Sequence, residues 1–199
     1  NATDGQDGGN NYYRGTCWYR KSFNIPSEYA GKTIYLRIGA ANMTSTVYVN
    51  GQRVGVHNGG YTAFMLDITS YVTLGEENIV TISVNNASTL PYAPLSGDFT
   101  FFGGITRTAE LVVCAPVHIN PIHIIQNDYT RKRLPIANPG VIIRQNNVSS
   151  SSADIAIETD LRNALDKATD VKIEAAIKDA AGKAVALMGE IQHIEANDT

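Results

Sequence analysis

One short segment of the chain combines residue types that can recognise a sugar. Between Pro91 and Arg107 the sequence reads PYAPLSGDFTFFGGITR, in which Asp98 is the only acid. Four aromatic residues surround this acid: Tyr92, Phe99, Phe101 and Phe102. Aromatic rings stack on the apolar face of a sugar ring, and a carboxylate accepts hydrogen bonds from its hydroxyl groups. The competing interpretation is a loop whose aromatic residues belong to a core and whose aspartate caps a turn. The residues alone leave both interpretations open.

The remaining chemistry-bearing residues do not form a recognisable site. The four histidines are His57, His118, His123 and His193. His118 and His123 are five residues apart, and no cysteine or carboxylate accompanies them at metal-ligand spacing, so we expect structural or solvent-facing roles. The sequence holds no Gly-x-Ser-x-Gly elbow, no phosphate-binding loop and no His-Glu-x-x-His motif. We therefore assign no catalytic and no metal-binding residue within this chain.

The charge of the chain excludes two classes of partner. Sixteen Lys and Arg residues stand against nineteen Asp and Glu residues, giving a net charge of −3. The longest basic run is the triplet 131–133. Nucleic acids and anionic membrane surfaces need concentrated positive charge, so we expect neither as a partner. Apolar stretches such as 111–115 are far shorter than the roughly 20 residues of a membrane-spanning helix, so we expect no membrane span.

The elements that position these residues follow a period of two, which is typical of strands. The expected core of a first domain comprises the apolar members of three alternating runs: Ile34, Leu36, Ile38, Val47, Val49, Val80, Ile82 and Val84. Asn50-Gly51 lies between two alternating runs, which predicts a hairpin with a type I′ turn. Short strands with frequent turns predict a sandwich or barrel, so the fold class is all-β.

The composition changes near residue 117, and the second part of the chain is rich in Ala, Ile and Asp. Helix propensity alone would favour helices across 153–194, but apolar and charged residues alternate there. We therefore expect strands and a second core built from Ile155, Ile157, Val171, Ile173 and Ile177. Asp179–Gly182 is predicted to be a hairpin turn. The domain prediction is 1–117 and 118–199.

The two cysteines, Cys17 and Cys114, allow one disulfide at most. A pair of buried thiols is favoured over a disulfide, because two cysteines in this length are ordinary usage. The sequence begins with Asn and not Met, which by itself leaves the compartment open.

Four stretches of the chain carry a resemblance to a known family. They read GTCWYRKSFNIP, VYVNGQRVGVHNGGYTAFMLDIT, GEENIVTISVNN and GDFTFFGGITRTAEL, in that order. Over residues 12–120 the sequence resembles the N-terminal domain of family 2 glycoside hydrolases, most of all the β-galactosidases. The resemblance implies a jelly-roll, sugar-binding-like domain over 1–117 and an immunoglobulin-like β-sandwich over 118–199. An (α/β)₈ barrel that performs the chemistry follows these two domains in the family.

The resemblance also implies a function for the chain. Hydrolysis in the family is retaining and uses two glutamates of the barrel, of which the acid/base commonly follows an Asn. This chain contains no Asn-Glu dipeptide. We therefore expect a non-catalytic N-terminal part of a larger glycoside hydrolase, inactive alone, that shapes the substrate pocket of its own barrel. The alternatives are a free-standing carbohydrate-binding module and a structural pair of β-domains.

Asp98 is the one position that carries over from the family as a substrate-binding residue, and we assign the neighbouring Phe99 to substrate binding as well. Asp98 is expected to contact substrate hydroxyls at the mouth of the barrel, and it is also a sodium-ligand candidate in the full enzyme. Arg107 is interpreted as a structural brace, and His57 and Tyr61 as parts of a turn and its packing. No cofactor is expected in this chain, with sodium or magnesium as candidates in the full-length enzyme. The expected partners are a carbohydrate substrate and the barrel, with a homo-oligomer left open. Enzymes of this type are often exported in bacteria, so the resemblance favours periplasmic or secreted localisation over cytoplasmic.

Overall fold

The computed structural model describes residues 13–87, 102–126, 133–137 and 140–198. Within these residues the chain consists of strands, turns and two short 3₁₀ helices, η1 (Ser27–Tyr29) and η2 (Thr69–Tyr71). No helix in the described part of the chain has the length and apolarity needed to cross a membrane. The all-β fold class predicted from the sequence is confirmed.

The chain folds into two compact units. The first unit comprises Asn1–Cys114 and Pro121–Pro139, and the second comprises Ala115–Asn120 and Gly140–Thr199. The chain therefore leaves the first unit after Cys114, returns to it for one hairpin and then completes the second unit.

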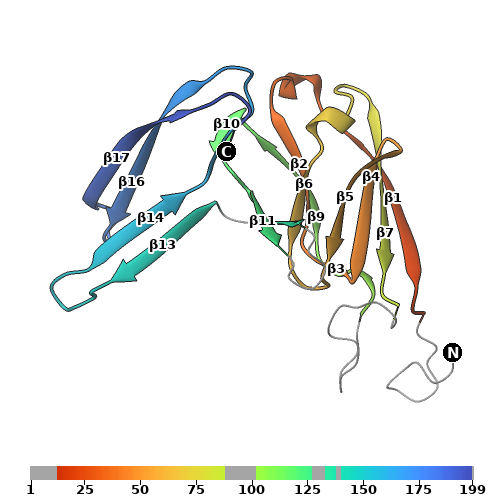
Figure 1. Ribbon diagram of the computed structural model, residues 1–199, viewed down its shortest axis with the longest axis horizontal. Coiled ribbons are helices and arrows are strands. Elements are labelled where there is room, and N and C mark those ends of the chain that lie inside the picture. Colours follow the sequence, from red (N-terminus) through yellow and green to blue (C-terminus); the bar gives the residue numbers. More distant parts are fainter. Residues whose placement is uncertain (1–12, 88–101, 127–132, 138–139, 199) are drawn as a thin grey trace, which may run out of the picture. The chain divides into compact units, whose positions relative to one another are not determined.

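The first unit contains two main antiparallel sheets (Figure 1). The four-stranded sheet has the order β1-β7-β4-β5, with β1 at Thr16–Asn24, β7 at Glu77–Asn85, β4 at Thr44–Val49 and β5 at Gln52–Asn58. The three-stranded sheet has the order β6-β2-β9, with β6 at Phe64–Asp67, β2 at Thr33–Ile38 and β9 at Ala109–Cys114. Two smaller pairs complete the unit: β3 (Ala41–Asn42) with β8 (Gly104–Ile105), and β11 (Ile122–Gln126) with β12 (Arg133–Ala137).

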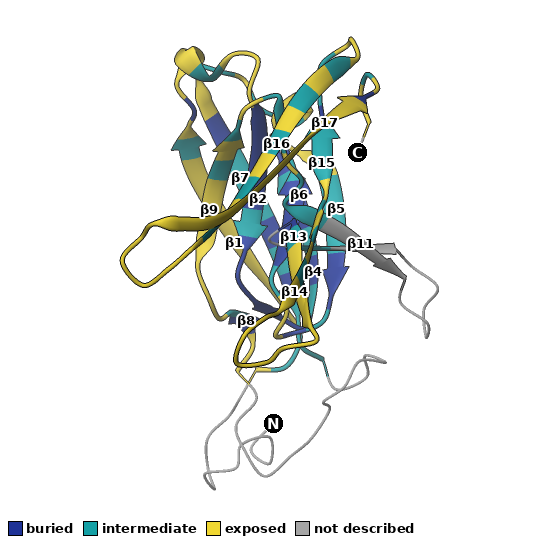
Figure 2. Ribbon diagram, turned by 90° about the vertical axis from the view of Figure 1, so that its left-hand side faces the viewer, coloured by how far each residue is buried: buried dark blue, intermediate teal, exposed yellow. Residues whose placement is uncertain are grey.

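The core of the first unit is built from the inward faces of the two main sheets. All of the core residues predicted from the alternation are buried except Val80, which is partly buried and packs against the others. Phe64, Ile68 and Ile25 extend the same cluster. Figure 2 shows the buried residues concentrated in strands such as β2, β4 and β6. Period two therefore identified the core because each strand buries only one face.

The Asn50-Gly51 pair forms the predicted turn between β4 and β5. Asn50 has a φ of 49° and Gly51 a φ of 79°, so both central residues adopt the left-handed conformation that a type I′ turn requires. β4 and β5 pair in the register that this turn sets, with Val49 opposite Gln52. The hairpin prediction is confirmed.

The second unit contains three antiparallel strand pairs. These are β10 (Val117–Ile119) with β15 (Leu161–Asn163), β13 (Val141–Asn146) with β14 (Asp154–Thr159), and β16 (Thr169–Lys178) with β17 (Ala184–Ile194). The regions that helix propensity alone would have made helical are thus strands. Asp179 closes the β16–β17 turn by accepting hydrogen bonds at Oδ1 from the backbone N–H groups of Ala181 and Lys183, each at 2.9 Å.

The predicted second core is less buried than expected. None of the five residues assigned to it is buried. All five are partly buried, and they alternate along their strands with exposed residues. Figure 2 shows β17 almost entirely exposed. The prediction of a second core is therefore wrong as to the burial of these five residues, because alternation identifies the apolar face of a strand but not whether another layer covers it.

Both cysteines are free thiols. Cys114 is partly buried, and this burial raises the pKa of its thiol. Cys17 is exposed on β1, so the expectation of two buried thiols is wrong for that residue.

Candidate functional site

The residues predicted to bind substrate, Asp98 and Phe99, lie outside the described residues, as do Tyr92 and Phe101. Phe102 is described, and 70% of its surface is exposed. The structure also describes Ala87, the last residue before this segment. The described part of the candidate site therefore consists of the residues on either side of 88–101 and the strand ends that contact them. We call this part the frame, and its main side chains are Asn42 and Asn86.

Four stretches of chain meet in this frame, at the end of the first unit where Figure 1 places β3. Asn42 of β3 pairs with Gly104 of β8. The backbone N–H of Met43 donates a hydrogen bond to the carbonyl of Asn85 at 3.0 Å, and that of Gly59 donates to the carbonyl of Met43 at 2.9 Å. The ends of β5 and β7 and the short strands β3 and β8 are thus joined by backbone hydrogen bonds, which fixes them relative to one another.

Asn42 is the central side chain of this frame. Only 2% of its surface is exposed, and its Nδ2 donates a hydrogen bond to the carbonyl of Phe102 at 2.8 Å. This bond holds the chain at the point where it returns from the segment that carries Asp98. Asn42 also begins an Asn-Met-Thr sequon, but a side chain that is buried and hydrogen-bonded in this way is unsuited to carry a glycan in the folded protein.

Asn86 plays the matching part on the other side. Its Oδ1 accepts a hydrogen bond from the backbone N–H of Gly15 at 2.9 Å, and its backbone N–H donates to the carbonyl of Gly15 at 3.2 Å. The next residue, Ala87, donates its N–H to Oδ1 of Asn85 at 2.9 Å. Side-chain amides therefore fix the chain on both sides of the undescribed segment.

Several buried polar atoms near this end have no hydrogen-bond partner among the described residues. They are Oδ1 of Asn42, Oγ1 of Thr44, Oγ of Ser45 and Nδ2 of Asn58. Thr44 and Asn58 lie opposite each other in the β4–β5 ladder. Thr44 and Ser45 are consecutive residues of β4 and point to opposite faces of the sheet, so these atoms do not line a single site.

The glycine pairs of the sequence allow the close contacts in this frame. A Cβ on Gly60 would lie 2.6 Å from Oδ1 of Asn42, and a Cβ on Gly103 would collide with the amide of Asn86. Neither position has room for a side chain without displacing an asparagine of the frame. Gly60 and Gly103 are therefore explained by close packing against Asn42 and Asn86, whereas Gly59 and Gly104 have φ values of 131° and 85°, which favour glycine.

Arg107 braces the frame through a backbone carbonyl, as interpreted from the sequence. Its Nη1 donates to the carbonyl of Tyr61 at 3.3 Å, which ties the segment after β8 to the turn after β5. Tyr61 itself is 48% exposed.

His57 lies within β5 and not in a turn. It is 1% exposed, and its ring stacks on Phe64 with ring centroids 4.3 Å apart. Its packing role is as expected.

Sequence reasoning missed the asparagines of the frame. Asn42, Asn58 and Asn86 lie at strand ends, where asparagine is common for its turn-forming tendency alone. Asn58 and Asn86 fall inside two of the stretches quoted for the family resemblance, whereas Asn42 falls outside all of them. Without the pairing of β3 with β8, nothing in the sequence joins these three positions.

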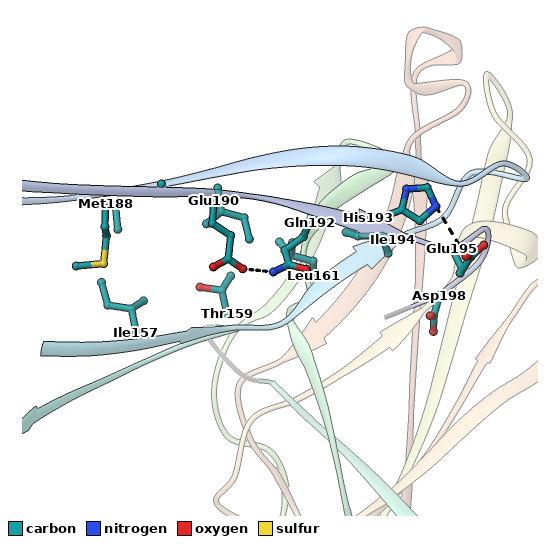
Figure 3. Close-up of a pocket in the computed structure, with 13 residues that line it drawn as sticks. Ile157, Thr159, Leu161, Met188, Glu190, Gln192, His193, Ile194, Glu195 and Asp198 are labelled. Carbon is teal, nitrogen blue, oxygen red and sulfur yellow. Dashed lines mark hydrogen bonds and ion pairs between the residues drawn. The ribbon is translucent and has the colours of Figure 1, made fainter.

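A hollow lies wholly within the second unit (Figure 3). It has a volume of about 480 Å³ and is lined by residues of β14 to β17 and the turn after β17, among them Ile157, Ile173 and Met188. Glu190 and Gln192 also face it, but they are hydrogen-bonded to each other. The hollow is the uncovered apolar face of the predicted second core, and we do not assign it a chemical role.

The described residues contain no group of three or more His, Cys, Asp or Glu that could hold a metal ion.

Two of the histidines contact groups close to them in the structure. Nδ1 of His118 lies 2.6 Å from the carbonyl oxygen of Ala115. His193 pairs with Asp170 across the β16–β17 ladder, with Nδ1 and Oδ1 2.6 Å apart. This hydrogen bond is the largest cause of a raised pKa for His193.

Comparison with known proteins identifies the first unit. Residues 6–115 match the model described as "Glycosyl hydrolases family 2, sugar binding domain". The chain is 37% identical over 163 residues to a β-glucuronidase of Bacteroides fragilis, an alignment that covers 82% of this chain and 22% of that protein. It is also 36% identical over 116 residues to a β-galactosidase of Thermoanaerobacter pseudethanolicus, covering 57% of this chain and 16% of that protein.

Solved structures give the same picture over a larger part of the chain. The fold is similar to Bacteroides uniformis β-glucuronidase 2, covalently bound to cyclophellitol-6-carboxylate aziridine, with a TM-score of 0.84 and 31% identity. That superposition covers 99% of this chain and 22% of the other. The chain thus spans about a fifth of the length of the curated relatives that it matches.

Proposed function

Because the chain belongs to family 2 of the glycosyl hydrolases, we propose that it is the non-catalytic N-terminal part of a retaining enzyme that hydrolyses β-galactosides or β-glucuronides. The observation that carries this proposal is the match of residues 6–115 to the sugar-binding domain of the family. Relatives named for each of the two activities share more than a third of the aligned residues with this chain.

The role of this chain in the reaction is to complete the substrate pocket. Asp98 would accept hydrogen bonds from sugar hydroxyls, with Phe99 packing against the ring. The hydrogen bond from Asn42 to the Phe102 carbonyl, together with those of Asn86, fixes the chain on both sides of these two residues. The frame would thereby limit the conformations of the binding segment before substrate arrives, which lowers the entropic cost of binding.

The reaction itself requires two carboxyl groups about 5–5.5 Å apart, one acting as nucleophile and the other as acid and then base. We place both outside this chain, in the barrel of the complete enzyme. The covalent complex of the Bacteroides uniformis enzyme supports a nucleophilic mechanism, because a retaining enzyme forms a covalent intermediate with its substrate.

The test is an assay of the complete polypeptide that contains these residues. Release of p-nitrophenol from its β-galactoside and β-glucuronide would be measured side by side, and the first-formed anomer of the sugar product would be recorded by NMR. We expect hydrolysis of at least one of the two substrates with retention of configuration. Inversion, or no activity on either substrate by a folded enzyme, would refute the proposal.

A further inference from the structure

The outer face of the four-stranded sheet presents an ordered set of side chains that no part of the core explains. The ladders place Arg20, Thr81, Tyr48 and Arg53 in one row across β1, β7, β4 and β5. They place Trp18, Ser83, Thr46 and Val56 in the next row. We call these eight positions the outer-sheet face. They alternate with buried residues such as Val47 and Ile82, so they lie on the side of the sheet away from the core.

Two aromatic rings form the centre of the outer-sheet face. Trp18 is 62% exposed, and its ring centroid lies 6.1 Å from that of Tyr48, with 36° between the ring planes. Trp18 is on β1 and Tyr48 on β4, with β7 running between them (Figure 1). The two rings therefore come together above the strand that separates them, and they offer one aromatic surface across three strands.

Hydroxyl groups surround this aromatic surface. Thr81 and Ser83 occupy the β7 positions between the rings, and Thr46 lies beside Tyr48 on the same face of β4. An aromatic surface with adjacent hydroxyls matches the two surfaces of a sugar, whose ring face is apolar and whose rim carries hydroxyl groups. An apolar protein partner would leave these hydroxyls without hydrogen bonds.

Arginines lie at both ends of the first row. Arg20 and Arg53 are exposed, and no ion pair joins either guanidinium to a carboxylate among the described residues. A guanidinium binds a carboxylate through two parallel hydrogen bonds. The charge of this face therefore selects an acidic ligand over a neutral one.

We propose that the outer-sheet face is a carbohydrate-binding site that binds an acidic oligosaccharide through its uronic acid residues. Trp18 and Tyr48 stack on sugar rings, and Arg20 or Arg53 pairs with a uronate carboxylate. The proposal does not depend on the hydrolase function, because it rests on the register and exposure of this sheet alone.

Trp18 supplies a direct readout, because it is the only tryptophan of the chain. The 199-residue chain would be titrated with a hexasaccharide of alternating glucuronate and N-acetylglucosamine while tryptophan fluorescence is followed. The same hexasaccharide with its carboxylates methyl-esterified is the neutral comparison. We expect a Kd on the order of 10⁻⁴ to 10⁻³ M for the acidic form, typical of an open and solvated site, and weaker binding of the ester.

Matched variants separate stacking from charge. Trp18→Ala and Tyr48→Ala, followed by NMR or calorimetry, should each weaken binding about tenfold. The double variant Arg20→Gln/Arg53→Gln should abolish the preference for the acid over its ester. Lys21→Gln removes a charge from the opposite side of β1, and Tyr13→Ala removes an exposed ring from outside the sheet, so both should bind as the unchanged chain does.

Three results would overturn the proposal. One is the absence of binding by a folded chain, checked by circular dichroism. Another is equal affinity for the acid and the ester, with the Arg20→Gln/Arg53→Gln variant unchanged. The third is self-association of the chain, seen by size-exclusion chromatography, that Trp18→Ala abolishes, because the outer-sheet face would then be a protein contact.

Discussion

Nδ2 of Asn50 donates a hydrogen bond to Oδ1 of Asn78 at 2.8 Å, and this bond joins the β4–β5 turn to the start of β7. Asn78 is fully buried, and its amide also accepts from the N–H of Thr73 and donates to the carbonyls of Thr73 and Glu76. Asn50 further donates to the Tyr71 carbonyl and accepts from the N–H of Ile79. Two asparagine amides thus hold together one end of the four-stranded sheet.

The Asn50 position can be divided into a backbone part and a side-chain part. Asn50→Gly keeps the positive φ but removes the side-chain hydrogen bonds, so it should lower the free energy of unfolding by about 1–3 kcal/mol. Asn50→Ala loses the same bonds and also pays for the left-handed backbone, roughly 1 kcal/mol more. Urea denaturation of the three proteins measures both differences. Equal stability of the Gly and Ala variants would contradict the type I′ assignment.

Asp98→Ala should reduce kcat/KM of the complete enzyme by roughly ten- to a hundredfold. Loss of a hydrogen bond between a charged group and a substrate hydroxyl costs about 1.5–3 kcal/mol. The melting temperature of the variant is the control, since a turn-capping aspartate would affect stability instead. A stable variant with unchanged turnover would assign Asp98 to turn capping.

The 199-residue chain on its own should hydrolyse neither β-galactosides nor β-glucuronides. A retaining mechanism needs two carboxyl groups on opposite sides of one glycosidic bond, and we place both in the barrel of the complete enzyme. Prolonged incubation with fluorogenic substrates sets the detection limit, and the complete enzyme serves as the positive control. Turnover that co-purifies with the chain and follows its concentration would show that this part of the protein is catalytic.

The β16–β17 hairpin should lose stability as the pH rises. The hydrogen bond to Asp170 is the largest cause that raises the pKa of His193 above its ordinary value of 6.5; desolvation opposes it, and the charges of Asp170 and Glu195 add to the rise. Because the folded pKa is the higher one, the stabilisation is complete below about pH 6.5 and disappears as the pH passes through the raised pKa.

NMR titration of the His193 ring gives this pKa directly. Asp170→Asn should lower it, and His193→Gln should remove the corresponding pH dependence of amide exchange in the hairpin. The pair is exposed, so the effect on global stability should be small. An unchanged pKa in Asp170→Asn would show that the hydrogen bond does not persist in solution.

The strands and the core of the first unit were predictable because short stretches of sequence determine them. Alternation in 33–38 or 80–84 identifies a strand and its buried face together, and Asn50-Gly51 specifies one turn geometry. The second unit was predictable in its strands but not in its burial. Ile173 and Ile157 alternate as core residues do, and nothing in their own sequence reports how completely they are covered.

The frame of the candidate site was not predictable for a different reason. Asn42 and Phe102 are 60 residues apart, and their contact depends on the pairing of two strands of only two residues each. Strands this short have no measurable period. The functional assignment of Asp98 stays a prediction from the family resemblance, since that residue is outside the described part of the chain.

The position of β1 has a consequence for handling the protein. In the described part of the chain β1 is the outermost strand of its sheet, nine residues long and almost wholly exposed. An unpaired edge of this length is a template for aggregation by edge-to-edge pairing with another molecule. Arg20 and Lys21 stand in the middle of that edge, where stacked copies would bring like charges together. These two cations therefore oppose edge-to-edge pairing of β1, and substituting both by neutral residues should lower the solubility of the purified chain.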